Sequence, residues 1–197
     1  MEKNNINNPD YWNHYWDLTK KDNMSGLTVP SVGNKFIDWA LPNSPHLGIL
    51  EIACGLGTVA DYCAKKGHTV LATDFSKNAI KICKQKYFKN DKLTFRVESL
   101  EESLAIKHKC DVVIALEILE HYTDPSAPLY KIFKRLLPGG RLIFSVPDGT
   151  GKNAYAPYHY SHLTYEKMIH LLFIFFKDVR FYRGEFYKTG IWGVAKK

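Results

Sequence analysis

The segment from Ile49 to Thr58 (ILEIACGLGT) constrains the fold of this 197-residue chain more than any other. An apolar run ends in Glu51, a loop of small residues follows, and a helical pattern begins near Thr58. This order is typical of a buried parallel strand joined to a helix by a tight turn. Because the loop lacks bulk, a ligand can approach its backbone closely, and the free N–H groups at the helix start point toward that ligand.

Two acidic residues indicate which ligand the turn binds. The letters GLGTVA match the dinucleotide fingerprint G-x-G-x-x-A, but a carboxylate at Glu51 would repel a pyrophosphate and attract an ammonium group or hydroxyls. Asp74 ends the next apolar run, where a carboxylate can accept hydrogen bonds from both ribose hydroxyls. A nucleoside with an amino-acid tail, such as S-adenosylmethionine (SAM), suits both residues. The alternative is that Glu51 caps the loop and Asp74 caps the next helix.

Alternating strand and helix patterns favour an α/β fold with a parallel sheet, in a single domain over residues 1–197. The patterns predict strands near 48–52, 69–73, 93–97, 111–116, 141–146, 178–184 and 190–196, and helices near 58–66, 76–88, 126–137 and 164–176. Ser76 and Thr164 are suitable N-cap residues. The last two strands are expected to pair as an antiparallel hairpin.

The first 40 residues depart from this pattern and are expected to form a helical lid. The run YWNHYWD places four aromatic side chains at helical spacing, Trp12 and Trp16 among them. Aromatic rings attract a cation such as a sulfonium, so these residues are predicted to cover the cofactor. The alternative is a helix that only packs against the core.

Candidate catalytic residues follow the strands expected at 111–116 and 141–146. Open α/β sheets bind ligands at the carboxyl ends of their strands. Glu120 and His121 follow the first of these strands, and His159 follows the second. Because histidine titrates near neutral pH, we expect His121, with Glu120 and His159, to take a proton from an acceptor. A structural or surface role is the alternative for each histidine.

The order of these segments resembles that of the class I SAM-dependent methyltransferases, from about Gly48 to the end of the chain. In that family an acidic residue ends a strand before a G-x-G-x-G-like loop, which here is ACGLG, with Ala53 at the first glycine position. The ribose-binding acid of the family corresponds to Asp74. The resemblance implies a Rossmann-like, doubly wound, seven-stranded sheet that is mostly parallel and has an antiparallel C-terminal strand.

The resemblance also implies that SAM is the cofactor and assigns residues to it. The predicted cofactor-binding residues are Trp12, Trp16, Glu51, Ala53, Gly55, Gly57, Asp74, Phe75, Ser99, Leu100 and Leu116. Ser99 and Leu100 are expected to flank the adenine, and Leu116 is expected to lie along the methionine part. The implied reaction is methyl transfer to a small-molecule acceptor, at oxygen rather than nitrogen, similar to the ubiquinone-biosynthesis O-methyltransferase group.

The run Glu117-x-x-Glu120-His121, together with His159, resembles the metal ligands of small-RNA 3′-terminal 2′-O-methyltransferases. Two carboxylates and two imidazoles suit a divalent ion that gathers two hydroxyls. However, the same run occurs in small-molecule methyltransferases without a metal. We therefore expect base catalysis and no metal.

Composition and charge narrow the range of partners. The net charge is +7, and lysine rather than arginine supplies most of it, whereas readers of nucleic acid more often use arginine. No apolar run is long enough for a membrane span, and the polar start MEKNNINNPD is not a secretory signal. The four cysteines contain no C-x-x-C pair. We expect a cytoplasmic protein with no membrane or nucleic-acid partner; the sequence leaves its oligomeric state open.

Two functions from other classes remain compatible with the sequence. An NAD-dependent oxidoreductase is supported by GLGTVA, although Glu51 and the missing nicotinamide-site pattern count against it. A non-catalytic SAM-binding partner protein is the second. Binding of NAD would indicate the first, and SAM binding without turnover would indicate the second.

Overall fold

The computed structural model describes residues 8–19, 30–105, 108–150, 159–182 and 190–197. Its strands are β1 (Gly48–Ile52), β2 (Thr69–Asp74), β3 (Leu93–Val97), β4 (Cys110–Leu116), β5 (Leu136–Pro147), β6 (Asp178–Phe181) and β7 (Gly190–Lys196). Its α-helices are α1 (Pro9–Thr19), α2 (Pro30–Ala40), α3 (Thr58–Lys65), α4 (Lys77–Lys86), α5 (Leu100–Ala105), α6 (Ser126–Arg135) and α7 (Tyr165–Phe173), and a 3₁₀ helix, η1, spans Leu119–His121.

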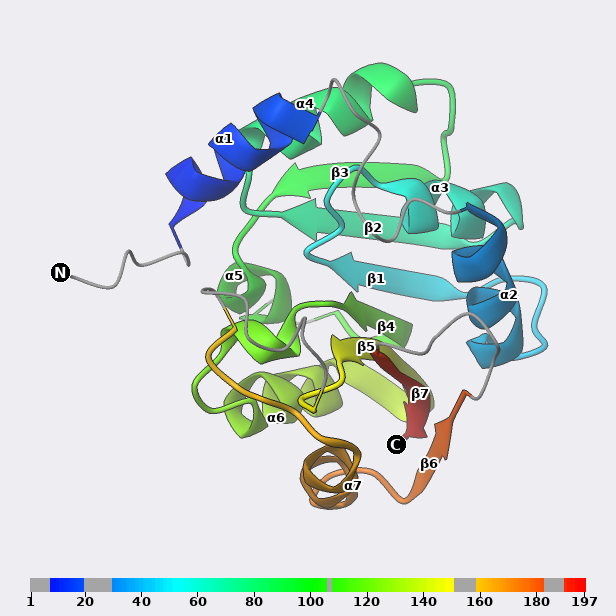
Figure 1. Cartoon of the computed structure of the whole chain (residues 1–197). Coiled ribbons are helices and arrows are strands. Elements are labelled where there is room, and N and C mark those ends of the chain that lie inside the picture. Colours follow the sequence, from blue (N-terminus) through cyan, green and yellow to red (C-terminus); the bar gives the residue numbers. More distant parts are fainter. Residues whose placement is uncertain (1–7, 20–29, 106–107, 151–158, 183–189) are drawn as a thin grey trace, which may run out of the picture.

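The strands of the described part form one seven-stranded sheet in the order β3-β2-β1-β4-β5-β7-β6 (Figure 1). Strands β1 to β5 pair in parallel, β7 is antiparallel to β5, and β6 pairs antiparallel with β7. The predicted fold class and the predicted C-terminal hairpin are therefore confirmed. Four successive residues of β4, from Val112 to Ala115, are completely buried. Such a continuous apolar run is typical of a parallel strand that is covered on both faces.

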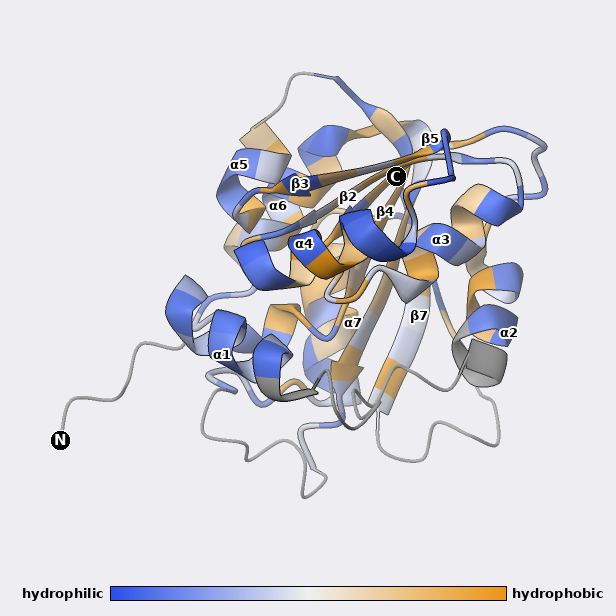
Figure 2. Cartoon of the chain, turned by 90° about the horizontal axis from the view of Figure 1, so that it is seen from above, coloured by the Kyte–Doolittle hydropathy of each residue, from blue (hydrophilic) through white to orange (hydrophobic). Residues whose placement is uncertain are grey.

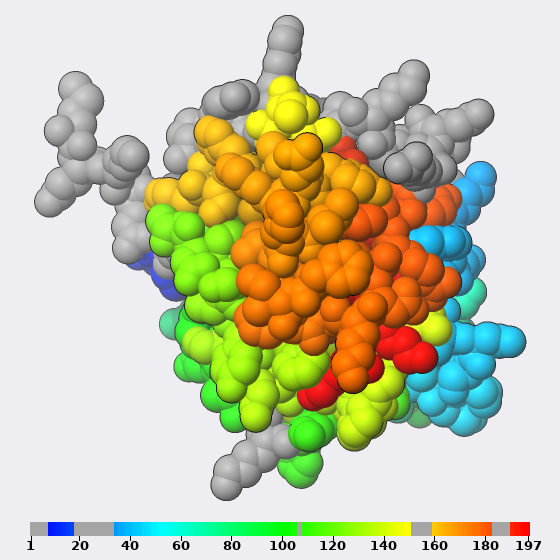
Figure 3. Space-filling view, turned by 90° about the horizontal axis from the view of Figure 1, so that it is seen from below, coloured from blue at the N-terminus to red at the C-terminus, as the bar shows by residue number. Residues whose placement is uncertain are grey.

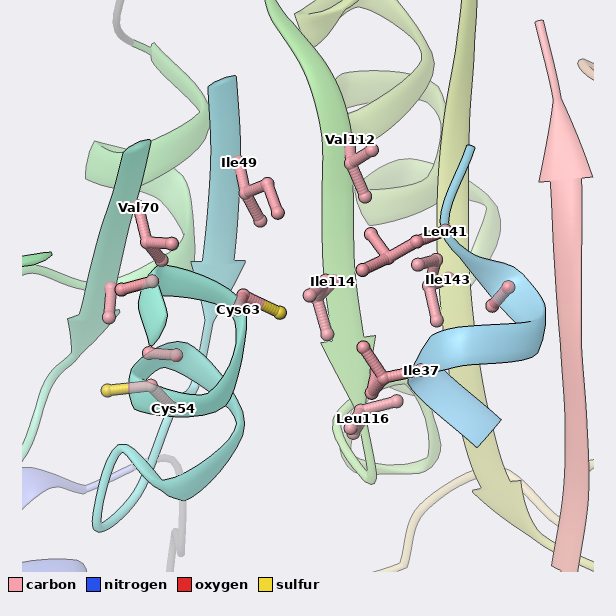
Figure 4. Close-up of a cluster of buried hydrophobic side chains, with 14 of the residues drawn as sticks. Ile37, Leu41, Ile49, Cys54, Cys63, Val70, Val112, Ile114, Leu116 and Ile143 are labelled. Carbon is pink, nitrogen blue, oxygen red and sulfur yellow. The ribbon is translucent and has the colours of Figure 1, made fainter. Parts of the chain in front are cut away.

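Helices cover both faces of this sheet. One hydrophobic cluster joins the sheet to α2, α3 and α4, and a second cluster joins it to α5, α6 and α7. Figure 4 shows Ile37 and Leu41, from the α2 segment, facing Ile114 and Ile143 of the sheet. Apolar residues line the strands, and polar residues occupy much of the helices (Figure 2). The sheet is therefore the middle layer of an α/β/α sandwich.

The α2 helix belongs to this core rather than to a surface cover. Its Phe36 and Ile37 side chains are 0% and 1% exposed. Burying a side chain of this size stabilises a fold by about 1.5–3 kcal/mol. Within the predicted N-terminal lid segment, α2 therefore has a structural role, whereas α1 lies beside α4 (Figure 1).

Several element boundaries differ from those predicted. The helix expected over 126–137 ends at Arg135, because Leu136 already pairs with Cys110 as part of β5. The short helix α5 follows β3 and starts with a reciprocal pair of hydrogen bonds between Ser99 and Glu102, a capping box. The S-x-x-E spacing that forms this box is present in the sequence, but the periodic pattern behind it is too short to predict a helix.

The C-terminal elements close the sheet on the side away from β3. The face shown in Figure 3 is formed mainly by α7 and β6 (orange), next to α6 (green). Thr164 caps α7 as predicted, since its side chain accepts a hydrogen bond from the Lys167 N–H. The predicted strand 178–184 corresponds to β6, and its last two positions lie outside the described residues. None of the described helices is long and apolar enough to cross a membrane.

Candidate active site

Strands β1 to β4 run in the same direction, so the residues that end them gather at one edge of the sheet. Glu51 lies near the end of β1, Asp74 ends β2, and Glu98 and Glu117 follow β3 and β4. This is the edge at which open parallel sheets bind ligands. Four carboxyl groups at one edge make it the candidate active site.

The loop after β1 has the conformation that close approach to a ligand requires. Ala53, Gly55 and Gly57 all have positive φ values, of 52°, 51° and 69°. For a residue with a side chain, this region costs roughly 1–2 kcal/mol, so Ala53 retains the backbone shape of the family's first glycine at an energetic cost. A Cβ atom at Gly57 would lie 2.7 Å from the ring of Phe95. Gly57 is therefore required by packing as well as by φ.

Asp74 connects this loop to the start of α4. Its Oδ2 accepts a hydrogen bond from the Gly55 N–H and its Oδ1 accepts one from the Ser76 N–H, both at 2.9 Å. Burial raises the pKa of Asp74 to about 6, against the lowering effect of these two bonds. The alternative capping role is thus present in the structure. A carboxylate oxygen has two lone pairs, so the same side chain can still accept hydrogen bonds from a ligand.

Glu51 carries the clearest sign of a ligand-binding role. The side chain is 4% exposed and accepts a hydrogen bond from the Ala60 N–H in the first turn of α3. Its Oε2 atom is buried and has no hydrogen-bond partner. Burial, with a smaller contribution from the charge of Asp74, raises the pKa of Glu51 to about 8. Since an unsatisfied buried acceptor is costly, an ammonium group at this position would stabilise the site.

The residues expected around the adenine have additional structural roles. Ser99 caps α5, and Leu100 is half-buried against the second hydrophobic cluster. Glu98, which we did not predict, has a buried Oε2 atom without a hydrogen-bond partner and is a further acceptor at this edge. The signal that could have identified it is an acidic residue directly after the third strand. Phe75 is half-buried beside Asp74, and Leu116 is buried at the end of β4.

The two tryptophans of α1 contact different parts of this edge. The Trp16 indole lies so close to Gly55 that a Cβ atom there would be 2.9 Å from the ring. The Trp12 ring instead contacts the ring of His121, with 5.6 Å between centroids and an interplanar angle of 79°. Helix α1 therefore spans from the glycine loop to the segment that follows β4.

Glu120, His121 and His159 form a compact cluster at that segment. The His121 Nε2 and His159 Nε2 atoms lie 3.9 and 4.0 Å from Glu120 Oε1, and the two imidazole centroids are 5.4 Å apart. His159 reaches the cluster because the N–H groups of Tyr160 and Ser161 donate to the carbonyl oxygen of Glu120. The structure thus brings together all three predicted catalytic residues.

Glu117 stands apart from this cluster. Its Oε1 accepts a 2.7 Å hydrogen bond from the Ser145 hydroxyl on β5, and its backbone has a φ of 53°. Burial raises the pKa of Glu117 to about 7, and burial together with the Glu117 charge raises the pKa of Glu120 well above its usual value. Among the described residues, the ligand atoms that lie within 4.8 Å of one another are those of Glu120, His121 and His159. These three side chains can accept and share a proton, and their donor atoms are also of the kind that bind a divalent ion.

Comparison with known proteins identifies a methyltransferase domain in this chain. Residues 50–144 match the family model described as "Methyltransferase domain". A ubiquinone biosynthesis O-methyltransferase from Klebsiella pneumoniae (strain 342) is 30% identical over 106 residues, which is 53% of this chain and 44% of that protein. The enzyme of the same name from Salmonella typhimurium is 30% identical over 107 residues, with the same two coverages. This chain therefore spans less than half the length of these relatives.

Solved structures share the fold at low sequence identity. Magnesium protoporphyrin IX methyltransferase from Synechocystis PCC 6803 with bound S-adenosylhomocysteine (SAH) has a TM-score of 0.72 at 19% identity, covering 96% of this chain and 97% of that one. A SAM-dependent methyltransferase from Archaeoglobus fulgidus has a TM-score of 0.71 at 16% identity, covering 93% and 99%. Residues 50–144 thus match a methyltransferase domain, and the described residues share the fold of these methyltransferases of known structure. The matched part carries the glycine loop and β4.

Proposed function

We propose that this chain transfers a methyl group from SAM to an oxygen atom of a small-molecule acceptor. The observation that carries the proposal is the buried Glu51 Oε2 atom without a hydrogen-bond partner, beside the glycine loop. This acceptor fits the ammonium group of SAM and would be unfavourable next to a pyrophosphate. It therefore favours a methyltransferase over an NAD-dependent oxidoreductase.

The cofactor-binding residues have separate roles in this proposal. SAM supplies the methyl group as an electrophilic carbon on a positively charged sulfur. Glu51 binds the ammonium group, and Asp74 accepts hydrogen bonds from the ribose hydroxyls. Ser99 and Leu100 flank the adenine, next to the additional acceptor on Glu98. The remaining predicted contacts come from the loop backbone at Ala53, Gly55 and Gly57, from Phe75 and Leu116, and from the covering rings of Trp12 and Trp16.

His121 takes the proton of the acceptor hydroxyl in the proposed reaction. An oxygen lone pair forms the new bond to the methyl carbon while the carbon–sulfur bond breaks, and SAH leaves with that electron pair. Glu120 Oε1 lies 3.9 Å from His121 Nε2 and 4.0 Å from His159 Nε2, and these two residues position the His121 imidazole. A positioned general base typically contributes about 10²–10⁴-fold to the rate.

The acceptor atom is inferred from relatives and from the site rather than from the fold. The curated relatives are named O-methyltransferases, and a cluster with two imidazoles suits a hydroxyl that must lose a proton. Fold alone does not fix the reaction, since the cyclase SpnF shares it with a TM-score of 0.63. We also place the protein in the cytoplasm, where four buried thiols without disulfides are stable.

Isothermal titration calorimetry and turnover with radiolabelled SAM test the proposal together. We expect SAH to bind and NAD not to bind, and we expect label transfer to hydroxyl-bearing compounds in an acceptor panel that also contains amines. Binding of NAD without SAH would overturn the methyltransferase assignment. SAH binding with label transfer only to amines would overturn the oxygen assignment, and SAH binding without any transfer across a broad panel would favour a non-catalytic partner protein.

A further inference from the structure

We propose that Asn13 and Trp12 of α1 are positioning residues that couple cofactor binding to the placement of His121. Asn13 forms hydrogen bonds between α1 and the start of α4, next to Asp74. Trp12, on the same helix, contacts the imidazole ring of His121. The inference rests on the proposed function, because it assigns Asp74 to the cofactor and His121 to the acceptor. It adds a physical link between the two halves of the site.

The first contact of this link is at the start of α4. The Asn13 Oδ1 atom accepts hydrogen bonds from the Ser76 hydroxyl at 2.8 Å and from the Asn78 N–H at 3.3 Å. The Asn78 side chain in turn donates to the Asn13 carbonyl oxygen and to Asp17 Oδ2. Since the Ser76 N–H donates to Asp74 Oδ1, an unbroken chain of hydrogen bonds runs from the predicted ribose carboxylate to α1.

The second contact is at the glycine loop. The Trp16 ring occupies the space directly beside Gly55, where a Cβ atom would be 2.9 Å away. The Gly55 N–H donates to the other carboxylate oxygen of Asp74. Asp74 therefore accepts hydrogen bonds from both the glycine loop and the start of α4, and α1 contacts each of them.

The third contact reaches the acceptor side. Trp12 and His121 meet edge to face, with ring centroids 5.6 Å apart, and this geometry restrains the plane of the imidazole. His121 is 7% exposed, so its ring is closely packed, with Trp12 as one of its neighbours. Trp12 is adjacent to Asn13 in sequence and lies one helical turn before Trp16, so α1 carries all three contacts on two successive turns.

The length of α1 makes its order depend on these contacts. A helix of 11 residues is marginal in water without tertiary packing. Cofactor binding that fixes Asp74 and the glycine loop would therefore stabilise the docked α1 and, through Trp12, the orientation of His121. The coupling predicts that the cofactor binds before the acceptor.

The test compares full-length wild-type protein with Asn13→Leu, Trp12→Leu and a matched control, His14→Ala, an exposed position on the same helix. The probe is SAH, and the readouts are its affinity and the NMR signal of the His121 ring. In the wild type and the control, SAH is expected to shift the His121 signal. In Asn13→Leu, SAH affinity should fall about five- to tenfold, the scale of a lost hydrogen-bond pair, and the His121 response should be lost.

Trp12→Leu separates the coupling from a general packing effect. At saturating SAH and SAM, so that a fall in affinity from the lost covering ring does not enter the readouts, it should lose the His121 response and show a lower kcat. If Asn13→Leu or Trp12→Leu keeps the wild-type His121 response, the coupling is wrong. If the wild type itself fails to bind SAH, the proposed function fails instead, so the two failures are distinguishable.

Discussion

The Glu51 carboxyl group is protonated in part at neutral pH in the ligand-free protein, because burial raises its pKa to about 8. An ammonium ligand binds the ionised form, so binding at pH 7 should release a proton. SAH affinity should therefore increase between pH 6 and pH 8. Calorimetry in buffers of different ionisation enthalpy measures this proton release, and the release should disappear in Glu51→Gln. A pH-independent affinity would show that Glu51 does not contact the ligand.

Asp74→Ala tests the second carboxylate. The substitution removes charge-assisted hydrogen bonds to the ribose, each worth about 1.5–3 kcal/mol, so SAH affinity should fall at least tenfold. It also removes the acceptors for the N–H groups of Gly55 and Ser76, so the melting temperature serves as the control for the capping role. Unchanged affinity in a folded variant would mean that Asp74 is only a cap.

His121→Ala tests the acceptor side. Turnover should fall by about 10²–10⁴-fold, the contribution of a general base, while SAH affinity remains within a few-fold of the wild type. His170→Ala, at an exposed position on α7, is the matched control and should leave both quantities unchanged. Turnover equal to that of the wild type would remove His121 from the mechanism.

A chelator distinguishes base catalysis from a bound ion at the same cluster. With base catalysis, EDTA should leave turnover unchanged. Loss of turnover in EDTA with recovery on adding a divalent ion would instead assign Glu120, His121 and His159 as metal ligands, since their donor atoms lie within 4.8 Å of one another.

At the scale of elements, α1 and α2 have different energetic roles although both precede the glycine loop. α2 inserts Phe36 and Ile37 into the core, whereas α1 packs beside α4 and contacts the glycine loop. A chain that starts at residue 20 keeps α2 and should therefore fold cooperatively. Its SAH affinity should be reduced at least fivefold, because the contacts at Gly55 and at the start of α4 are lost. Calorimetry on both chains measures the difference, and equal affinity would mean that α1 serves only for packing.

At the scale of the whole molecule, burial of carboxyl groups at one edge makes stability depend on pH. Burial raises the folded-state pKa values of Glu51, Asp74 and Glu117 above those of free carboxyl groups, to about 8, 6 and 7. Between pH 4.5 and 8 the folded state thus binds more protons than the unfolded state, so the free energy of unfolding falls as pH rises. The melting temperature of the ligand-free protein should accordingly decrease from pH 5 to pH 8.

SAH should offset the fall in the free energy of unfolding at high pH. A ligand at 100 times its dissociation constant adds about 2.7 kcal/mol to the free energy of unfolding, and the gain should be larger at pH 8, where Glu51 is ionised. NAD at the same concentration should leave the melting temperature unchanged. A melting temperature that rises with pH in the absence of ligand would show that the buried carboxyl groups are ionised in the folded state.

Much of the fold could be predicted from local patterns. Strand and helix periods, the small-residue loop and the caps at Ser76 and Thr164 are encoded in adjacent residues, and they predict the parallel sheet and its ligand-binding edge. Glu51 and Asp74 could be predicted as site residues because each lies at the end of a parallel strand, within β1 and β2. Glu98 is likewise an acidic residue at the end of a strand, directly after β3. The predicted adenine contacts, Ser99 and Leu100, are the next two residues, and the prediction does not include the buried acceptor on Glu98.

The sequence by itself therefore determined the class of fold, the edge that we propose for the cofactor and the residues at the end of each strand, since these depend on short-range backbone geometry. Only the tertiary structure decided which side chains meet across that edge. His159 joins Glu120 through backbone hydrogen bonds between distant segments, and Asn13 reaches Ser76 over 63 positions of chain. No periodicity encodes such contacts, because they depend on how loops and the N-terminal helix pack against a completed sheet. The separation of Glu117 from the histidine cluster has the same origin, since its carboxyl group is held by Ser145 on the neighbouring strand.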